Sequence, residues 1–324
     1  MTAEFETILT KQLGIELPII GGAMYPCSNP ELVAAISEAG GIGVLQPISL
    51  TYVHGHDYRA GIRYMRTLTS KPIGMNALIE QSSKAYQRRM TEWIDVALEE
   101  GIRFFVTSLG NPRWVVDRVS GAGGFVYHDV TERKWALKAR DAGVHGLIAV
   151  NSDAGGHAGP KAPRVLFDEL ADLGLPVICA GGVSDGATFR SALAIGYAGV
   201  QMGTRFIATT ECTANAAYKN AIVEAGANDI VLTERLTGVP VAVIRNEHVA
   251  RTGTKAGPIA RWMLRGRKTK HWMRTIYALT SLRRLKHSLH ASRGRDDYWQ
   301  AGRSVAGIDE ILPVAEVIRR MIER

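Results

Sequence analysis

The sequence predicts an α/β protein in which eight parallel strands close into one barrel, and three observations support this. Short apolar segments alternate with helical patterns eight times within roughly 210 residues, which is the pattern of repeated βαβ units. The apolar segments are rich in Val, Ile, Phe and Met, as expected of strands buried on both faces. A doubly wound open sheet is the competing architecture, but no GxGxxG follows an early strand. We therefore predict a (β/α)8 TIM barrel with an added C-terminal helical segment.

Each strand is expected where a short apolar run ends in turn residues, and each helix where a capping residue precedes a periodic apolar pattern. In the first helix, Asn29 is the expected N-cap, Pro30 takes the first helical position, and Gly40 and Gly41 end the helix. The strands are expected at 17–20, 42–45, 72–77, 104–107, 124–130, 146–152, 176–182 and 198–206. The helices are expected at 29–39, 58–68, 83–100, after 112, up to 141, from 163, at 185–195 and at 213–225.

The chain is expected to divide into a barrel core over 1–228 and an added segment over 229–324 that packs on it. Residues 229–246 are predicted as an extended excursion, and 305–323 as a closing helix. Between them, 260–290 is almost free of Gly and Pro, and its apolar residues are at helical spacing from Trp272 onward. This indicates one or two basic amphipathic helices, either packed with the basic face in solvent, or forming a lid over an acidic ligand or a membrane contact.

The formal net charge of +8 is a local property of this added segment. Residues 251–295 hold 13 Lys and Arg and no Asp or Glu, and the rest of the chain has 26 basic and 31 acidic residues. Nucleic-acid binding would therefore have to reside on that segment alone, and we predict none.

Composition also bears on the compartment. The N-terminus lacks an apolar signal region, and no apolar run is long enough to span a membrane. The three cysteines, Cys27, Cys179 and Cys212, lack zinc or CxxC spacing, as expected of reduced thiols. We expect a cytoplasmic protein without a transmembrane segment.

A glycine-rich loop follows the sixth predicted strand and is the first candidate for chemistry. It reads VNSDAGGHAG over 150–159, so that His157 stands among Gly155, Gly156 and Gly159. Glycines allow a ligand to approach the backbone closely, and histidine titrates near neutral pH. The alternative is a glycine-rich turn with an incidental, solvated histidine.

A second candidate site is predicted where the seventh and eighth strands end. Gly181 and Gly182 precede a helix start at Ser184 and Asp185, and the eighth strand carries Gln201, Met202, Gly203 and Thr204. Backbone N–H groups and a threonine hydroxyl form an anion site without a lysine, and barrels of this class bind phosphate at this position.

The same end of the barrel should collect Gly22, Ala23 and Met24 from the first strand and Asn76 from the third. An asparagine at a strand end is a candidate contact for a heterocycle. The histidines lack metal-ligand spacing, so no metal site is predicted. The absence of GxSxG makes a serine hydrolase a weak hypothesis.

Taken together, these motifs resemble the nitronate monooxygenase family, formerly called 2-nitropropane dioxygenases. The resemblance covers most of 15–215 and rests on GGAM at 21–24, EAGGIGVL at 38–45, MN at 75–76, SDAGGHAG at 152–159, CAGGVSDG at 179–186 and VQMGTRF at 200–206. It extends to the related FMN-dependent enoyl-acyl-carrier-protein reductases and NADH:quinone reductases.

The resemblance implies that FMN binds non-covalently at the carboxyl ends of the strands. Its phosphate would lie on Gly181, Gly182, Gly203 and Thr204, with Gln201 and Met202 in the same block, and its ring near Gly22, Ala23, Met24, Asn76 and Gly155. His157 matches the active-site histidine of the family. Three positions depart from the family pattern: Asp153 replaces a frequent Glu, Val150 a frequent Gln, and Asp129 a lysine of some relatives.

The leading hypothesis is an FMN-dependent monooxygenase that oxidises alkyl nitronates with O2 to a carbonyl compound and nitrite. His157 would act as a base toward a neutral nitroalkane or as a cation beside an anion. Tyr25, His128 and Trp299 are candidates to line the substrate space, although packing roles are expected for each.

A second hypothesis is an NAD(P)H-dependent FMN reductase of enoyl thioesters or quinones. The basic residues of the added segment, such as Arg261 and Lys268, would suit an acidic carrier protein or a CoA phosphate. The third hypothesis is a barrel-based binding protein that binds a ligand but catalyses no reaction. The sequence does not decide the oligomeric state, and a homodimer is possible.

Overall fold

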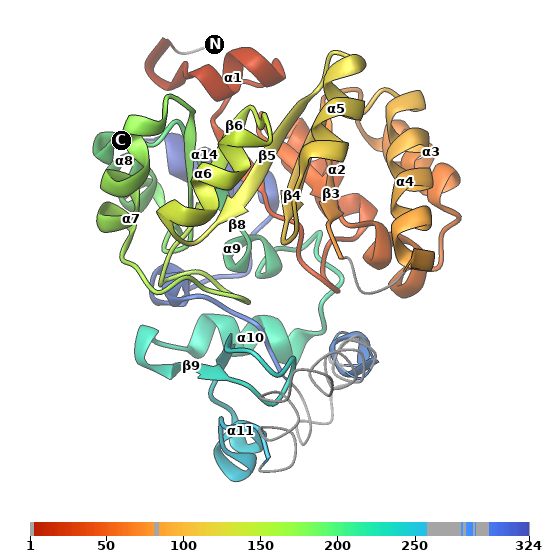
Figure 1. Cartoon of the computed structure of the whole chain (residues 1–324). Coiled ribbons are helices and arrows are strands. Elements are labelled where there is room, and N and C mark those ends of the chain that lie inside the picture. Colours follow the sequence, from red (N-terminus) through yellow and green to blue (C-terminus); the bar gives the residue numbers. More distant parts are fainter. Residues whose placement is uncertain are drawn as a thin grey trace.

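The structure is a computed structural model, and it describes residues 3–80, 84–257, 280, 283–287, 289 and 298–323. Eight parallel strands form a closed barrel in sequence order, with β8 hydrogen-bonded to β1 (Figure 1). The fold prediction is therefore confirmed. The strands are β1 (Ile19–Gly21), β2 (Ile42–Leu45), β3 (Ile73–Leu78), β4 (Phe104–Ser108), β5 (Phe125–Val130), β6 (Gly146–Val150), β7 (Val177–Ala180) and β8 (Gly199–Met202).

Helices surround the barrel. They are α2 (Pro30–Glu38), α3 (Tyr58–Leu68), α4 (Lys84–Glu99), α5 (Arg113–Gly121), α6 (Arg133–Asp141), α7 (Pro163–Leu170) and α8 (Gly186–Ile195). After β8 come the single turn α9 (Thr204–Ile207) and α10 (Ala216–Glu224), and near the end of the chain α14 (Val314–Ile322). Because α14 packs against both α2 and α8, it fills the outer position that would otherwise lie open beside β8.

Two apolar layers follow from the alternation of side chains along the strands. One lies inside the barrel and includes Ile20, Val44, Phe104, Tyr127 and Ile148. The other lies between the strands and the outer helices, as expected when helices cover a parallel sheet.

A short helix that the sequence analysis did not predict, α1 (Ile8–Leu13), covers the amino ends of the strands (Figure 1). Leu9 is fully buried in the interior layer. Gln12 accepts a hydrogen bond of 2.7 Å from the Tyr127 hydroxyl, which ties α1 to the side chains inside the barrel.

The predicted excursion is an antiparallel hairpin of β9 (Ile230–Thr233) and β10 (Val241–Ile244), followed by α11 (Glu247–Thr252). It lies at the end of the barrel opposite α1 (Figure 1). The Ala242 amide donates to the Gly156 carbonyl at 2.7 Å, and the Ile244 amide donates to the Trp299 carbonyl at 2.9 Å. The hairpin is thereby joined to the loop after β6 and to the returning C-terminal chain.

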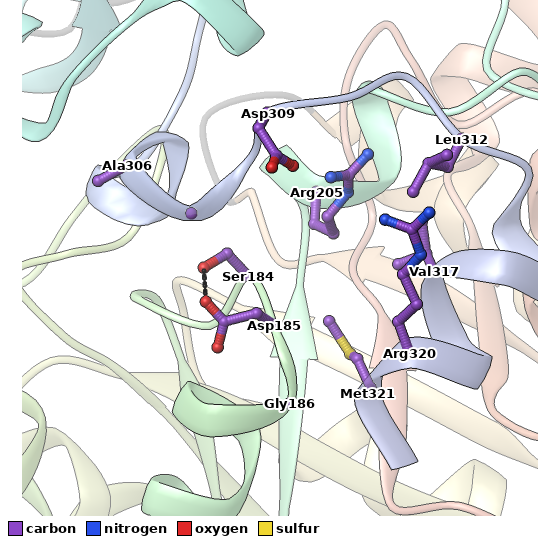
Figure 2. A pocket seen from close by; sticks show the side chains of 11 residues that line it. Ser184, Asp185, Gly186, Arg205, Ala306, Asp309, Leu312, Val317, Arg320 and Met321 are labelled. Carbon is purple, nitrogen blue, oxygen red and sulfur yellow. Dashed lines mark hydrogen bonds between the residues drawn. The ribbon is translucent and has the colours of Figure 1, made fainter. Parts of the chain in front are cut away.

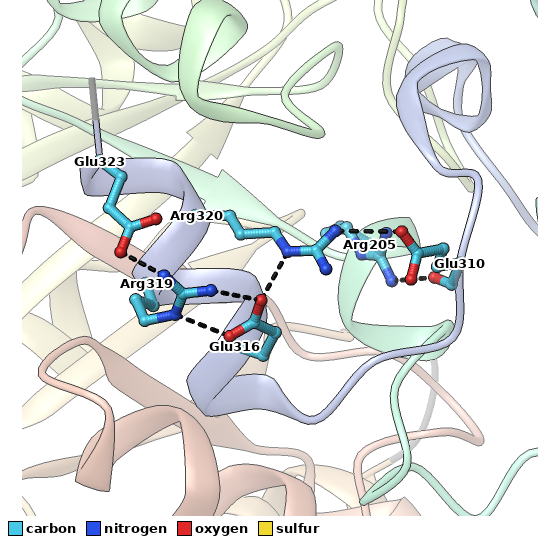
Figure 3. A network of polar contacts seen from close by, with 6 residues as sticks. All are labelled: Arg205, Glu310, Glu316, Arg319, Arg320 and Glu323. Atoms are coloured by element: carbon cyan, nitrogen blue, oxygen red, sulfur yellow. Dashed lines mark hydrogen bonds and ion pairs between the residues drawn. The ribbon is translucent and has the colours of Figure 1, made fainter.

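Helix α14 is held in place by ion pairs and by a buried arginine (Figure 3). Arg320 pairs with Glu316 at 2.6 Å and with Glu310 at 3.1 Å. Arg205, which follows β8, donates to the Glu310 carbonyl at 2.6 Å. The C-terminal segment is therefore attached to the end of the eighth strand.

Several boundary predictions need correction. The eighth strand ends at Met202, and Thr204–Ile207 is helical, since the chain turns outward there to complete the barrel. The closing helix begins at Val314 because Pro313 precedes it. Asn29 occupies the N-cap position, but its side chain makes no capping bond and binds the 211–213 loop instead. Most of the predicted basic helices at 260–290 lies outside the described residues.

All three cysteines are buried and unbridged. In the described part of the chain, no helix is long and apolar enough to cross a membrane.

Candidate active site

The strand register places four side-chain positions in one inward layer at the carboxyl end of the barrel. In barrels of this type alternate strands contribute to each layer. The pairing register, followed from strand to strand around the barrel, places four residues of the odd-numbered strands at one level. They are Gly22 directly after β1, Asn76 on β3, Asp129 on β5 and Ala180 on β7, and we call them the mouth layer. Gln201, from β8, lies just below it, in register with Ala180. Polar side chains are thus gathered at this end, above an apolar interior.

Glycines allow the backbone to approach these side chains closely. At Gly22 an added Cβ would lie 3.1 Å from Gln201 Cγ, and at Gly203 it would lie 3.3 Å from Met24 Sδ. The Gly22 amide donates to the Met202 carbonyl at 2.9 Å, so the ends of β1 and β8 are joined. The structure therefore brings together four of the predicted residues, Gly22, Met24, Gln201 and Gly203.

Gly181 and Gly182 both have positive φ, at 116° and 81°, a backbone conformation that favours glycine. An added Cβ at Gly181 would lie 2.4 Å from Asn151 Oδ1. Asn151 is fully buried, and its amide nitrogen donates to the Gly181 carbonyl at 3.0 Å. The sequence analysis did not select Asn151, which connects the loops after β6 and β7.

A second residue that sequence reasoning missed is Gly302, in the chain returning before α14. Its amide donates to the Thr204 hydroxyl at 3.0 Å. An added Cβ at Gly302 would lie 2.4 Å from the Asp153 carbonyl, and one at Gly155 would lie 2.9 Å from the Gly302 amide nitrogen. Residues 301–303 therefore lie against the loop after β6 and beside the end of β8.

His157 is exposed on the glycine loop after β6, and the hairpin reaches it. The Thr237 hydroxyl lies 3.4 Å from His157 Nε2 and donates to the Val239 carbonyl at 3.0 Å. Because a hydroxyl has one proton, this arrangement favours the tautomer in which Nε2 donates to Thr237 and Nδ1 is the acceptor. Partial desolvation by the loop and the hairpin lowers the pKa of the imidazole, which favours its neutral form.

Two buried polar atoms of this region have no hydrogen-bond partner within the described residues, Asp129 Oδ1 and Gln201 Oε1. Burial raises the pKa of Asp129 to about 7. Buried polar atoms are normally paired, so unpaired ones at the mouth of a barrel indicate a ligand that supplies the partners.

Other predicted residues point elsewhere. Met202 places its side chain in the layer between strands and helices, so only its backbone can face a ligand at the mouth. His128 lies on the outer side of β5, 2.8 Å from the Thr107 hydroxyl, and burial lowers its pKa to about 4. Trp299 stacks on Tyr218 with ring centroids 5.9 Å apart. These contacts agree with the packing roles expected of His128 and Trp299, although Trp299 Nε1 is buried without a partner among the described residues.

A cavity of about 360 Å³ lies between α8, α9 and α14, beside the segments that follow β7 and β8 (Figure 2). Arg205 and Arg320 line it, as do Asp185 and Asp309, so its charges balance. Its walls include the side chains that attach α14 to the barrel, and we regard it as part of that junction. In the residues that the structure describes, no group of His, Cys, Asp or Glu has the arrangement of a metal site.

Comparisons with known proteins agree with this geometry. The family model described as nitronate monooxygenase matches residues 6–324. The chain is 30% identical to (3aS,4S,5R,7aS)-5-hydroxy-7a-methyl-1-oxo-octahydro-1H-indene-4-carboxyl-CoA dehydrogenase of Mycobacterium tuberculosis, over 90% of this chain and 81% of that protein. It is 28% identical to a probable nitronate monooxygenase of Staphylococcus saprophyticus, over 76% of this chain and 80% of that protein.

Among solved structures, FabK from Thermotoga maritima superimposes with a TM-score of 0.80 and 28% identity, covering 98% of this chain and 95% of that one. A TIM barrel with a polar, glycine-lined mouth suits an α/β-barrel oxidoreductase, and the family match shows that the chain is of this class. The chain belongs to the nitronate monooxygenase family, which is a family of flavin enzymes.

Proposed function

We propose that the protein is an FMN-dependent oxidoreductase that oxidises alkyl nitronates with O2 to a carbonyl compound and nitrite. The observation that carries the proposal is the place of His157: it contacts Thr237 through Nε2, on an exposed loop at the end of the barrel where Asp129 Oδ1 and Gln201 Oε1 have no partner among the described residues. Substrates of this reaction reach the enzyme as nitronate anions or as neutral nitroalkanes, and only the neutral form needs a base.

The residues present fit FMN. Gly181, Gly182, Gly203 and Thr204 would hold its phosphate, because backbone N–H groups and a hydroxyl at two neighbouring strand ends bind anions well. The unpaired Gln201 Oε1, beside Gly22, would accept a hydrogen bond from the ring. When bound, FMN would supply the two-electron chemistry of the reaction.

His157 has a defined part in this proposal. The contact with Thr237 favours Nε2 as the protonated nitrogen, and Nδ1 would then take the proton from the carbon next to the nitro group. Because the pKa of the imidazole is lowered, the base is present over the neutral pH range.

The first experiment is anaerobic reduction of the purified flavoprotein by an alkyl nitronate and, separately, by NAD(P)H. Rapid bleaching of the flavin by nitronate alone supports the proposal. Bleaching by NAD(P)H alone contradicts it. His157→Asn should lower turnover of the neutral nitroalkane about 10²–10⁴-fold, the usual range for loss of a general base, and affect the nitronate less.

The hydroxyl of Thr237 offers a matched pair of variants. Thr237→Val removes the acceptor that fixes the histidine tautomer, whereas Thr237→Ser keeps it. We expect the valine variant to lose nitroalkane turnover and the serine variant to retain it. Equal rates in both would rule out a positioning role for this hydroxyl.

A specific observation favours a second candidate, an FMN-dependent oxidoreductase of acyl thioesters such as CoA esters. The Lys286 ammonium lies 4.3 Å from the Tyr52 ring centroid, in the segment after β2, and Arg284 donates to the Arg235 carbonyl of the hairpin at 3.4 Å. Cationic side chains therefore border the strand-end face, where they would suit the phosphates of CoA. The name of the mycobacterial relative includes a CoA thioester.

This candidate is tested by a double variant, Arg284→Gln with Lys286→Gln. It should raise the KM for an acyl-CoA without changing that for a nitronate. Lys11→Gln, on the exposed face of α1 at the other end of the barrel, is the matched control. An unchanged KM in the double variant counts against a CoA thioester.

A further inference from the structure

Asp129 is the acidic residue of the mouth layer, and neither the proposed anion site nor His157 uses it. It alternates along β5 with Tyr127, which lies in the interior apolar layer, so its carboxyl faces into the barrel. The register pairs it with Ile148 on β6. Its position is therefore set by two strands of a closed barrel, and not by a loop.

No side chain among the described residues holds this carboxyl. Within that part of the chain, Oδ1 is buried without a hydrogen-bond partner, and no cation pairs with the carboxyl. The surface carboxylates differ from it: Asp95 and Asp172, for example, are paired with arginines. An unpaired carboxyl inside a barrel is costly when charged, so its proton is easily retained.

Among the described residues, the barrel positions around Asp129 are uncharged. The inward positions nearest the mouth on the other seven strands and their ends are neutral: Gly22, Gln46, Asn76, Ser108, Val150, Ala180 and Gln201. The titratable groups of the surrounding segments include Asp153 beside Gly182, His157 at the hairpin and Tyr25 after β1, and the cations Arg284 and Lys286 border the face. Within the mouth layer itself, a negative charge that enters would therefore be opposed by Asp129.

We propose that Asp129 is a proton-exchanging residue of the cofactor pocket, which takes up a proton from solvent when the flavin is reduced and releases it on reoxidation. The proposal rests on FMN binding at the mouth of the barrel. Two electrons and one proton convert oxidised flavin to its anionic reduced form. The second proton goes to the Asp129 carboxylate, so the pocket gains no net charge. A hydride from a donor such as NAD(P)H carries the two electrons and the first proton, and the second proton comes from solvent.

The reduction equilibrium of the bound flavin tests this directly, without turnover. The equilibrium constant for electron transfer from a reduced reference dye to the flavin is measured from pH 5.5 to 8.5, in the wild type and in Asp129→Asn. We expect the variant to favour reduced flavin by about tenfold or more at pH 8.5, because like charges at neighbouring sites shift a pKa by a unit or more. At pH 5.5 the two proteins should agree, since the carboxyl is already protonated.

A matched control and a second measurement complete the test. Asp117→Asn makes the same charge change on an exposed position of α5 and should leave the constant unchanged. In the wild type, the reduced-minus-oxidised infrared difference spectrum at pH 8 should gain a protonated carboxyl band that Asp129→Asn lacks.

The outcomes separate the two proposals. If wild type and variant bind FMN but give the same constant at every pH, and no carboxyl band appears, the role of Asp129 is refuted and the proposed function stands. If the purified wild type does not bind FMN, both proposals fail.

Discussion

At the amino end of the strands, α1 covers the barrel. Its residue Leu9 is fully buried, and its residue Gln12 accepts a hydrogen bond from the Tyr127 hydroxyl. At the carboxyl end, the mouth layer holds two positions without side-chain bulk, and Asp129 Oδ1 in it and Gln201 Oε1 below it have no partner among the described residues. The same strands connect the two ends. The difference indicates that one end contributes stability, while the other retains polar groups that a ligand could satisfy.

The largest effect that distinguishes the ends is expected from Leu9→Ala. The side chain has no exposed surface and packs near Gly199, so its truncation leaves a cavity and should lower the free energy of unfolding by about 2–5 kcal/mol. Chemical denaturation measures this loss, and flavin affinity at low temperature should be unchanged. Ile8→Ala, the exposed neighbour in α1, is the control and should change stability by less than about 0.5 kcal/mol. A loss of flavin affinity in Leu9→Ala would contradict the separation of the two ends.

A smaller effect is expected from the titration of Asp129 in the protein without cofactor. Its pKa is raised from 3.8 to about 7, so the folded state binds more protons than the unfolded state between these values. Stability contributed by the protonated carboxyl is therefore complete below pH 4 and is lost as the pH rises toward 7. At pH 8, the free energy of unfolding of Asp129→Asn should exceed that of the wild type by about 2 kcal/mol, so the variant should unfold at a higher denaturant concentration. This difference is smaller than the whole pKa shift would give, because the mouth admits water. At pH 4 the two proteins should have the same stability.

The titration of His128 changes stability with pH in the opposite direction to that of Asp129. The comparison with Asp129→Asn is therefore necessary. Burial lowers its pKa to about 4, so the unfolded state binds the extra proton and stability rises with pH up to about 6.5. The wild-type curve alone mixes the two groups, whereas the difference between wild type and Asp129→Asn isolates the carboxyl. A difference that is constant from pH 4 to pH 8 would show that Asp129 titrates normally.

The parts of the fold that local patterns determine were predictable from sequence. The ranges of β2 and α3 agree with those expected, because an apolar run before a turn and a periodic apolar face each leave a local signal. Helix α1 left a weaker one, since it has six residues and only a few of them are buried. The strand ends also indicated where glycines and His157 would gather, because a parallel barrel brings all carboxyl ends to one face.

The missing parts of the site depend on contacts between distant segments. Gly302 follows Thr204 by 98 positions in the sequence, and no local pattern pairs its amide with that hydroxyl. The contact between Thr237 and His157 spans 80 positions and requires the hairpin to fold back over the loop. Asp129 stood out as a departure from the family pattern, but its lack of partners depends on what the other strands place around it.

The smallest effect gives the sharpest test, because one substitution can be made at both ends of the barrel. Gln201→Leu removes an unpaired buried oxygen, so the protein without cofactor should gain about 1 kcal/mol of stability and lose about tenfold in FMN affinity. Gln12→Leu removes the acceptor of the Tyr127 hydroxyl, so it should lose about 1–2 kcal/mol and keep its FMN affinity. Denaturation and flavin titration of both variants measure the four values. Destabilisation by both substitutions would mean that Gln201 is satisfied without a ligand, and the carboxyl end would then be as complete as the amino end.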